Sequence, residues 1–310
     1  MLALDGWTLH NGCMIDQNRG KLYLVPVPIG NPRDISLRAL DVLGSVKTIL
    51  AEDTRETVKL LSKYQVRTPL ISYHQHNEKS RLAQIKAMLD QGQDLALVSD
   101  AGMPCISDPG EVLVADLVRA GDYQIVALPG ATAGLTCLVA SGLRTAHYSF
   151  VGFLESKGSL RREQLNECVS LQHTFILYEA PHRLVKTLKD LVDLGMGQRL
   201  VCLGRELTKT YESYFRGSLS EALLHYTEQE EPRGEFVLVI EGQADFLARN
   251  PEESRKQLVV GLETIEADLT ELLRGGMKLK PAAAYLADKR GLSKKQIYQI
   301  GLEILEKDQG

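Results

Sequence analysis

Short apolar segments alternate with longer amphipathic segments through the first half of the chain. The short segments are rich in Val, Ile and Leu and end in proline, glycine or acidic residues, which is typical of strands. The longer segments repeat apolar residues at helical spacing, as Leu82, Ile85 and Leu89 do. This alternation predicts an α/β domain whose sheet is mainly parallel and covered on both faces. The expected strands are 21–28, 48–52, 69–72, 94–98 and 124–128.

Two helices in this half have recognisable starts. Asp34 is expected to cap a helix that carries Leu37, Leu40 and Leu43 on one face. Pro109 is expected to open a helix over 109–120, because a first-turn proline has no N–H to leave unpaired.

The second half begins with a connection, 131–142, that is rich in small residues and is expected to be helical. An amphipathic helix with Leu184, Leu188 and Leu191 on one face lies among its strands. The last strands have hairpin character, which predicts a mixed sheet in a second lobe. The strands expected here are 147–153, 173–178, 199–203, 211–216 and 236–240.

After residue 242 the strand signals stop and the chain predicts three helices. Between Arg274 and Lys295 there are seven basic residues and one acid, Asp288, so this stretch has an excess of 7 − 1 = 6 positive charges in a chain of net charge −4. A Gly291 turn followed by Ser293 is typical of a helix-turn-helix pair. The asymmetry favours a surface that contacts phosphates over the alternative, a solvated helical face. The residues expected to bind RNA here are Lys278, Lys280, Lys289, Arg290, Lys294 and Lys295.

Length and composition set the outer limits. A chain of 310 residues with 44% hydrophobic and 25% charged residues predicts a globular protein of more than one domain. No apolar run reaches ~18 residues, so no membrane span is expected. The five cysteines are scattered without CxxC spacing, which indicates a reducing cytoplasm. The expected parts are a disordered or over-extended start (1–20, with Met14 an alternative beginning), an α/β lobe (21–130), a second α/β lobe (131–245) and a basic helical domain (250–310).

The residues after the expected strand 94–98 form a stiff loop with glycine, proline and two aspartates, Asp100 and Asp108. Open α/β sheets bind ligands at the carboxyl ends of their strands, so this loop is a candidate site; the alternative is an ordinary connection. Neither a GxGxxG nor a GxxxxGK[ST] motif is present, which leaves a dinucleotide site and a phosphate-binding ATPase loop unsupported.

Two histidines, His74 and His76, alternate beside Glu78. Two histidines are too few for a closed metal site, so no metal is expected. Contact with an RNA phosphate or ribose is favoured for this pair, and for Arg161 and Arg162 in a second basic segment.

Seven motifs occur in the order seen in one family. They are LVPVPIGN (24–31), EDTR (52–55), VSDAGMP (98–104), LPG (128–130), YEAPHR (178–183), RELTK (205–209) and RGEFVLVIEG (233–242). The chain thereby resembles the ribosomal small-subunit RNA methyltransferase I family, a branch of the tetrapyrrole (precorrin-type) methylases. The resemblance covers residues 20 to 310.

This resemblance implies S-adenosylmethionine bound between two α/β lobes of a tetrapyrrole-methylase-like fold with a small all-α C-terminal domain. It also implies 2′-O-methylation of a cytidine in 16S rRNA of the small ribosomal subunit, and a homodimer. The residues expected to bind the cofactor are Pro28, Gly30, Asp100, Ala101, Gly102, Ser107, Pro129, Gly130, Ala131, Tyr178 and Glu235.

A ribose hydroxyl is a poor nucleophile, so a nearby group should accept or orient its proton. Glu52 and Lys209 are the candidate bases, and Arg55 and Arg205 are candidates for holding the target phosphate through paired hydrogen bonds. Glu179 and Glu206 complete the catalytic candidates. For each of these residues the alternative is a structural ion pair at a strand end.

Two other functions stay open. The same fold methylates tetrapyrrole carbons, but such a substrate gives no role to the basic tail. The second is a non-catalytic RNA-binding factor in ribosome assembly. Val27, Met103 and Ala131 stand where the family usually has Thr, Thr and Pro, and these departures are what the second alternative would rest on.

Overall fold

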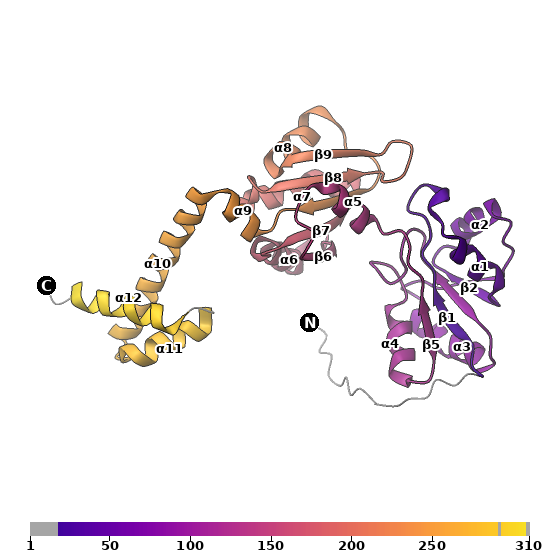
Figure 1. Ribbon diagram of the computed structural model, residues 1–310, viewed down its shortest axis with the longest axis horizontal. Coiled ribbons are helices and arrows are strands. Elements are labelled where there is room, and N and C mark those ends of the chain that lie inside the picture. Colours follow the sequence, from indigo (N-terminus) through magenta and orange to yellow (C-terminus); the bar gives the residue numbers. More distant parts are fainter. Residues whose placement is uncertain (1–17, 291–292, 308–310) are drawn as a thin grey trace. The chain divides into compact units, whose positions relative to one another are not determined.

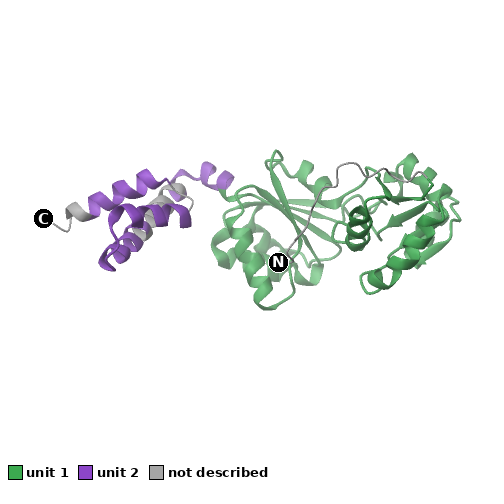
Figure 2. Ribbon diagram, turned by 90° about the horizontal axis from the view of Figure 1, so that it is seen from below, with its two compact units in different colours: residues 1–243 green, residues 244–310 purple. Residues whose placement is uncertain are grey.

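The computed structural model describes residues 18–290 and 293–307, except for the side chains at 254–264, 290 and 305–307. The residues form two compact units, 1–243 and 244–310 (Figure 2). The expected start 1–20, with its alternative beginning at Met14, lies almost wholly outside the described residues.

The first sheet has five parallel strands in the order β3-β2-β4-β1-β5 (Figure 1). Buried residues alternate between its two faces, so Ile49 packs with α1 and α2 while its neighbour Leu50 packs with α3 and α4. The sequence-based expectation of a mainly parallel sheet covered on both faces is confirmed. The elements are β1 (Lys21–Leu24), β2 (Thr48–Ala51), β3 (Leu70–Ser72), β4 (Leu95–Val98), β5 (Gln124–Ala127), α1 (Leu37–Ser45), α2 (Thr54–Lys63), α3 (Glu78–Asp90) and α4 (Glu111–Ala120).

Three expected element boundaries in this lobe are wrong, one of a strand and two of helices. The strand expected over 21–28 ends at Leu24, because Pro26 and Pro28 cannot donate to a ladder. Asp34 lies in a short 3-10 helix, η1 (Pro32–Asp34), and the cap of α1 is Ser36, whose hydroxyl accepts from Ala39 N at 3.0 Å. Leu37 is 82% exposed and so does not belong to the buried face. The helix expected from Pro109 begins at Glu111 with Gly110 as its cap.

The second sheet is mixed, with the order β6-β7-β10-β8-β9. Only β6 and β7 run parallel among its described strands, and the other neighbours are antiparallel, as the hairpin pattern predicted. Its elements are β6 (Tyr148–Phe153), β7 (Thr174–Glu179), β8 (Leu200–Arg205), β9 (Ser213–Ser218), β10 (Phe236–Ile240), α6 (Gly158–Ser170), α7 (Pro181–Leu191) and α8 (Leu219–Leu224), with π-helical turns η2 (Val192–Met196) and η3 (His225–Gln229).

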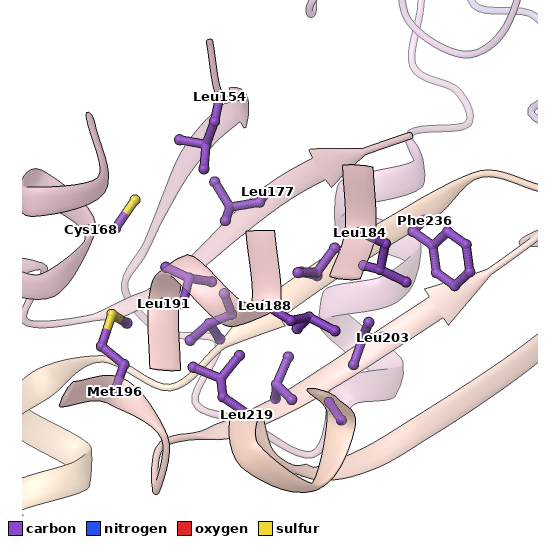
Figure 3. Packing of buried hydrophobic residues seen from close by; sticks show 14 of the residues in the cluster. Leu154, Cys168, Leu177, Leu184, Leu188, Leu191, Met196, Leu203, Leu219 and Phe236 are labelled. Carbon is purple, nitrogen blue, oxygen red and sulfur yellow. The ribbon is translucent and has the colours of Figure 1, made fainter. Parts of the chain in front are cut away.

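The two faces of this sheet have different cores. Leu177, Leu203 and Phe236 point to α7 and α8, where they pack with Leu184 and Leu188 (Figure 3). The opposite face, with Ile176 and Val237, packs against α5 (Ala133–Ser141), the helix that follows the first sheet. Because Ile29 of the first lobe joins this second cluster, apolar packing brings the ends of both sheets together.

The second unit contains helices α10 (Pro251–Arg274), α11 (Leu279–Arg290) and α12 (Lys294–Lys307), and α9 (Gln243–Arg249) leads into it. The three expected helices are present. They enclose a small core made of Ile265, Leu269, Ala282, Ala283, Leu286 and Ile297. Among the residues described, no helix combines the length and apolarity that crossing a membrane requires.

Candidate functional site

A cleft of about 340 Å³ lies inside the first unit, where the ends of the two sheets meet. This volume is at the lower end of the range typical of small-molecule sites, ~300–1,000 Å³. The first lobe contributes the loop after β4, and the second lobe contributes the ends of β7 and β10 and the loop after β8. The lining residues are Ile29, Ala101, Gly102, Met103, Ile106, Ser107, Asp108, Thr132, Ala133, Phe153, Tyr178, Glu179, Ala180, Pro181, Leu207, Glu235, Phe236 and Val237.

The shape of the loop after β4 depends on three residues with left-handed backbone conformation and on an isolated β-bridge to the first loop of the chain. Gly102 has φ +76° and exchanges two backbone hydrogen bonds with Val27, of 2.9 and 3.1 Å. Cys105 and Ser107 also have positive φ, +68° and +64°, although neither is glycine. Such residues each cost about 1–3 kcal/mol and persist only where the surroundings hold them.

Glu78, the first residue of α3, is one of the groups that hold this loop. The residue is 8% exposed, and its carboxylate accepts from Gly110 N at 2.8 Å and from the Tyr73 hydroxyl at 3.2 Å. Gly110 has φ +129°, and a Cβ there would lie 2.5 Å from Leu97 and 2.6 Å from the Cys105 sulfur. The loop is therefore anchored at its far end, so that residues 106–108 face the cleft.

Replacing Glu78 by alanine is expected to destabilise the protein by about 1–3 kcal/mol, because the Gly110 N–H and the Tyr73 hydroxyl would be buried without a partner. Urea unfolding measures this change in the free energy of unfolding. Glu78→Gln is the matched control and should cost less, since its amide oxygen can still accept from Gly110. Equal losses for both variants would contradict the anchoring role.

Three carboxylates gather at the carboxyl ends of β2 and β4. Burial, and then the charge of Asp100, raise the pKa of Glu52. Burial is also the main cause that raises the pKa of Asp100, whose Oδ1 accepts from Asp53 N at 3.0 Å. Burial, followed by the charge of Glu52, raises the pKa of Asp108 to about 7. Of the three, Asp108 lines the cleft.

The loop after β8 meets the first loop of the chain. Thr208 has φ +64° and its hydroxyl accepts from Asn31 N at 2.9 Å. Glu206 has φ +48°, and its carboxylate accepts from Glu235 N and from Lys209 Nζ, both at 2.9 Å. Gly30 fits only because it has no Cβ: one built there would lie 2.5 Å from Lys209 Cγ and 2.8 Å from the Leu207 carbonyl.

The residues predicted to bind the cofactor fall in two groups. Ala101, Gly102, Ser107, Tyr178 and Glu235 line the cleft. The others do not line the cleft: Pro28, Gly30, Asp100 and Ala131 are each next to a lining residue in the sequence, and Gly130 and Pro129 come two and three positions before Thr132. The Tyr178 hydroxyl accepts from Gly134 N at 3.0 Å, which fixes its ring at the start of α5.

Of the predicted catalytic residues, only Glu179 lines the cleft. The residue is 2% exposed, and its carboxylate already accepts from the Thr187 hydroxyl at 2.5 Å and from Ala180 N at 2.9 Å. Glu52 lies partly buried at the end of β2.

The other predicted catalytic residues have ionic partners. Arg55 is paired with Asp53, and Arg205 with Glu230. Lys209 Nζ lies 2.9 Å from the carboxylates of both Glu206 and Glu235. These pairs are the structural alternative that the sequence left open.

Arg161 cannot belong to the surface that was expected to bind RNA. It is 3% exposed, and its guanidinium donates to Asp190 at 2.6 Å and to Thr187 at 3.0 Å. Arg162, next to it in α6, is exposed.

The histidines and the basic residues of the second unit lie on the surface to different degrees. The His74 and His76 rings are 5.9 Å apart in the turn after β3; His76 is exposed and His74 half-buried. Within the described part of the chain, no cluster of three or more His, Cys, Asp or Glu could hold a metal ion. Lys278, Lys280, Lys289, Lys294 and Lys295 are all exposed, while the side chain of Arg290 lies outside those described.

Sequence reasoning missed the apolar part of the cleft wall. Met103, Ile106, Phe153, Leu207 and Val237 all line it, and Ile106 and Phe153 are 42% and 51% exposed. Each lies in or near an expected strand end or a motif, so its position in the sequence indicates the region of the site. No sequence pattern distinguishes an apolar residue that faces a ligand from one that packs in a core.

Comparison with known proteins gives a consistent result. A family profile of the Tetrapyrrole (Corrin/Porphyrin) Methylases matches residues 21–223. The chain is 43% identical over 285 residues to a protein of Synechocystis sp. named "Ribosomal RNA small subunit methyltransferase I", covering 92% of this chain and 98% of that one. A protein of the same name from Bacillus subtilis is 42% identical over 279 residues, covering 90% and 93% of the two chains.

Solved structures share the fold. A cobalt precorrin-4 methyltransferase of cobalamin biosynthesis superposes with a TM-score of 0.55 at 18% identity, covering 75% of this chain and 99% of that one. A uroporphyrin-III C-methyltransferase from Thermus thermophilus, complexed with S-adenosylhomocysteine, gives a TM-score of 0.51 at 19% identity, covering 73% and 98% of the two chains.

Proposed function

Because the chain belongs to the tetrapyrrole methylases, and among them to the ribosomal RNA small subunit methyltransferase I family, we propose that it methylates the 2′-hydroxyl of a cytidine ribose in 16S rRNA. It is a methyltransferase that uses S-adenosylmethionine and acts on the RNA of the small ribosomal subunit. The choice of a cytidine and of its 2′-oxygen rests on the resemblance.

The cleft suits the methyl donor. Its wall is mainly apolar, with Met103, Phe153 and Val237 available to cover an adenosyl group, and the Tyr178 ring beside them. Glu235 offers a carboxylate to the positive charges of the donor. The single observation that carries the proposal is this combination of apolar wall and carboxylates in a cleft between the carboxyl ends of the first sheet and the second lobe.

S-adenosylmethionine supplies an electrophilic methyl group on a sulfonium. The protein has only to align the ribose oxygen with the methyl carbon and to manage the proton of the hydroxyl, because the barrier to such an in-line displacement falls mainly through positioning. The left-handed loops at 105–107 and 206–208 give both lobes rigid edges for this task. We assign Lys209 to holding the second loop. Burial lowers its pKa, but its two carboxylate partners together raise the pKa by more, so its amine is already protonated at neutral pH and cannot accept a proton.

The second unit would present the RNA. Its five described exposed lysines lie on or beside α11 and α12, and Lys289 Nζ lies 5.8 Å from the centre of the Tyr285 ring. Lysines beside aromatic rings suit a nucleic acid, whose phosphates and bases they contact. This feature favours RNA over a tetrapyrrole, which is a small molecule.

We also propose that the protein works as a homodimer in the cytoplasm, as the resemblance implies. Val139 and Leu135 of α5 are 77% and 43% exposed, and Tyr148 lies exposed on the edge strand β6. Exposed apolar side chains of this kind are typical of protein–protein contacts. The four described cysteines are free, which agrees with a reducing compartment.

The test is methyl transfer from labelled S-adenosylmethionine to isolated small ribosomal subunits, with uroporphyrinogen as the competing substrate. We expect label in the rRNA, recovered after nuclease digestion as 2′-O-methylcytidine. Label in the porphyrinogen alone would identify a tetrapyrrole methyltransferase. Cofactor binding without any transfer would favour a non-catalytic assembly factor.

A further inference from the structure

Asp108 is a carboxylate that the fold places in the cleft wall and that the family motifs quoted above do not include. It follows Cys105 and Ser107, whose φ values of +68° and +64° bend the loop toward the cleft. Ser107 lies against the bulge of β6, since a Cβ on Gly152 would be 3.1 Å from the Ser107 hydroxyl. Two residues further on, Gly110 N is held by Glu78 at 2.8 Å. The position of Asp108 is therefore fixed from both sides.

The groups that surround Asp108 are acidic or neutral. Glu52 comes from the end of β2, Asp100 and Cys105 from the same loop, and Tyr178 from β7 of the other lobe. Ser99 hydrogen bonds to Asp108 and acts against the effect of burial on its pKa. Glu179 and Glu235 are the further carboxylates in the cleft wall. Burial and neighbouring negative charges favour the protonated form of a carboxyl group, so Asp108 gains and loses its proton near neutral pH. A general base that acts at that pH needs this property.

The other carboxylates of the wall are less suited to accept a proton. Both oxygens of Glu179 are hydrogen bonded, and Arg183 lies 3.2 Å from one of them. Glu235 is paired with Lys209 at 2.9 Å, and its side chain is 77% exposed. Either group would have to give up a partner before it could take a proton from a substrate.

We propose that Asp108 is the catalytic base of the methyl transfer, accepting the proton of the ribose hydroxyl. The inference rests on the proposed function. In the step, the ribose O–H bond breaks and its proton goes to the Asp108 carboxylate. The oxygen forms a bond to the methyl carbon, and the carbon–sulfur bond breaks with its electron pair left on sulfur as a neutral thioether. No other reactant is needed.

Asp108→Asn, measured on the full-length protein with small ribosomal subunits, tests this role. We expect kcat to fall at least about a hundredfold, the usual contribution of a general base, while the Kd for S-adenosylmethionine changes less than about threefold. In the wild type, kcat should rise with pH through a limb at or below about 7, and the variant should lack that limb. Asp108→Glu should recover part of kcat and the limb. Asp41→Asn, on the exposed face of α1, is the control.

A pH-dependent stability measurement separates a base from a structural carboxylate. The folded pKa of about 7 lies above the ordinary value of ~3.9, so between these values the folded state binds more protons than the unfolded state. Stability contributed by Asp108 is thus lost as pH rises through this window. Asp108→Asn should melt above the wild type at pH 8, and the difference should vanish below pH 4.

Three outcomes would overturn the inference. If the variant keeps kcat, or keeps the limb, another group takes the proton. If the Kd for S-adenosylmethionine rises in parallel with the loss of activity, Asp108 anchors the cofactor instead. If the variant melts below the wild type at pH 8, the carboxylate is structural. Inactive wild-type protein would count against the proposed function itself, before any variant is compared.

Discussion

Replacing Gly30 by alanine is expected to raise the Kd for S-adenosylmethionine at least tenfold, which is about 1.4 kcal/mol. The new Cβ would lie 2.7 Å from the Thr208 hydroxyl and 2.8 Å from the Leu207 carbonyl. Lys209 can move its side chain away, but the Leu207 carbonyl belongs to the backbone. The loop after β8 must therefore shift, and Leu207 and Ile29, which both line the cleft, must shift with it.

The hydrogen bond from Asn31 N to Thr208 Oγ1, 2.9 Å long, would be lost in the same movement. Overpacking of this kind also destabilises a fold, here by about 1–3 kcal/mol. Calorimetric titration of the cofactor and a thermal melt measure both effects. Gly44→Ala is the matched control, because a Cβ there meets nothing within 4 Å and alanine is the better helix former in α1. An unchanged cofactor Kd for Gly30→Ala would mean that the contact between the two loops does not shape the cleft.

Neutralising the five described lysines of the second unit is expected to weaken rRNA binding by about a hundredfold or more at low salt. The residues are Lys278, Lys280, Lys289, Lys294 and Lys295, all changed to glutamine. Each phosphate contact releases counterions, so the slope of log K against log salt should become shallower by about 3–4 units. The Kd for S-adenosylmethionine should not change, because the cleft is lined by residues of the first unit.

Binding to small subunits across a salt series gives the slope directly. The variant with all five lysines changed to arginine is the control, since it keeps the charge and should keep the slope. If the glutamine variant has the wild-type slope, the second unit does not contact phosphates and RNA must be held elsewhere.

The fold followed closely from the sequence where local patterns decide structure. Strands 94–98 and 236–240 were expected almost as they occur, because a buried strand is a continuous apolar run between turn residues. The cap of α1 was misplaced because Asp34 and Ser36 are both good caps. Ser36 is the cap because Asp34 already belongs to the short 3-10 helix that begins at Pro32.

The site followed less closely, because a cleft is made by residues far apart in the sequence. Glu235 and Tyr178 were expected from motifs, and both line the cleft. Arg161 was expected on the surface, yet it is buried and donates to Thr187 and Asp190 of α7. No local pattern in the sequence predicts partners from another helix. Asp108 was expected only as one of two aspartates in the candidate loop after the strand 94–98. Its proximity to Glu52, 56 positions away in the sequence (108 − 52 = 56), exists only in the folded sheet.

A crystal structure of the protein with S-adenosylhomocysteine tests the proposed function most directly. We expect the ligand to fill the cleft between Ala101–Met103 of the first lobe and Tyr178 and Val237 of the second, with its sulfur on the side of Asp108. A ligand bound elsewhere on the chain, or a cleft filled by the side chains of Ile106 and Phe153, would contradict it.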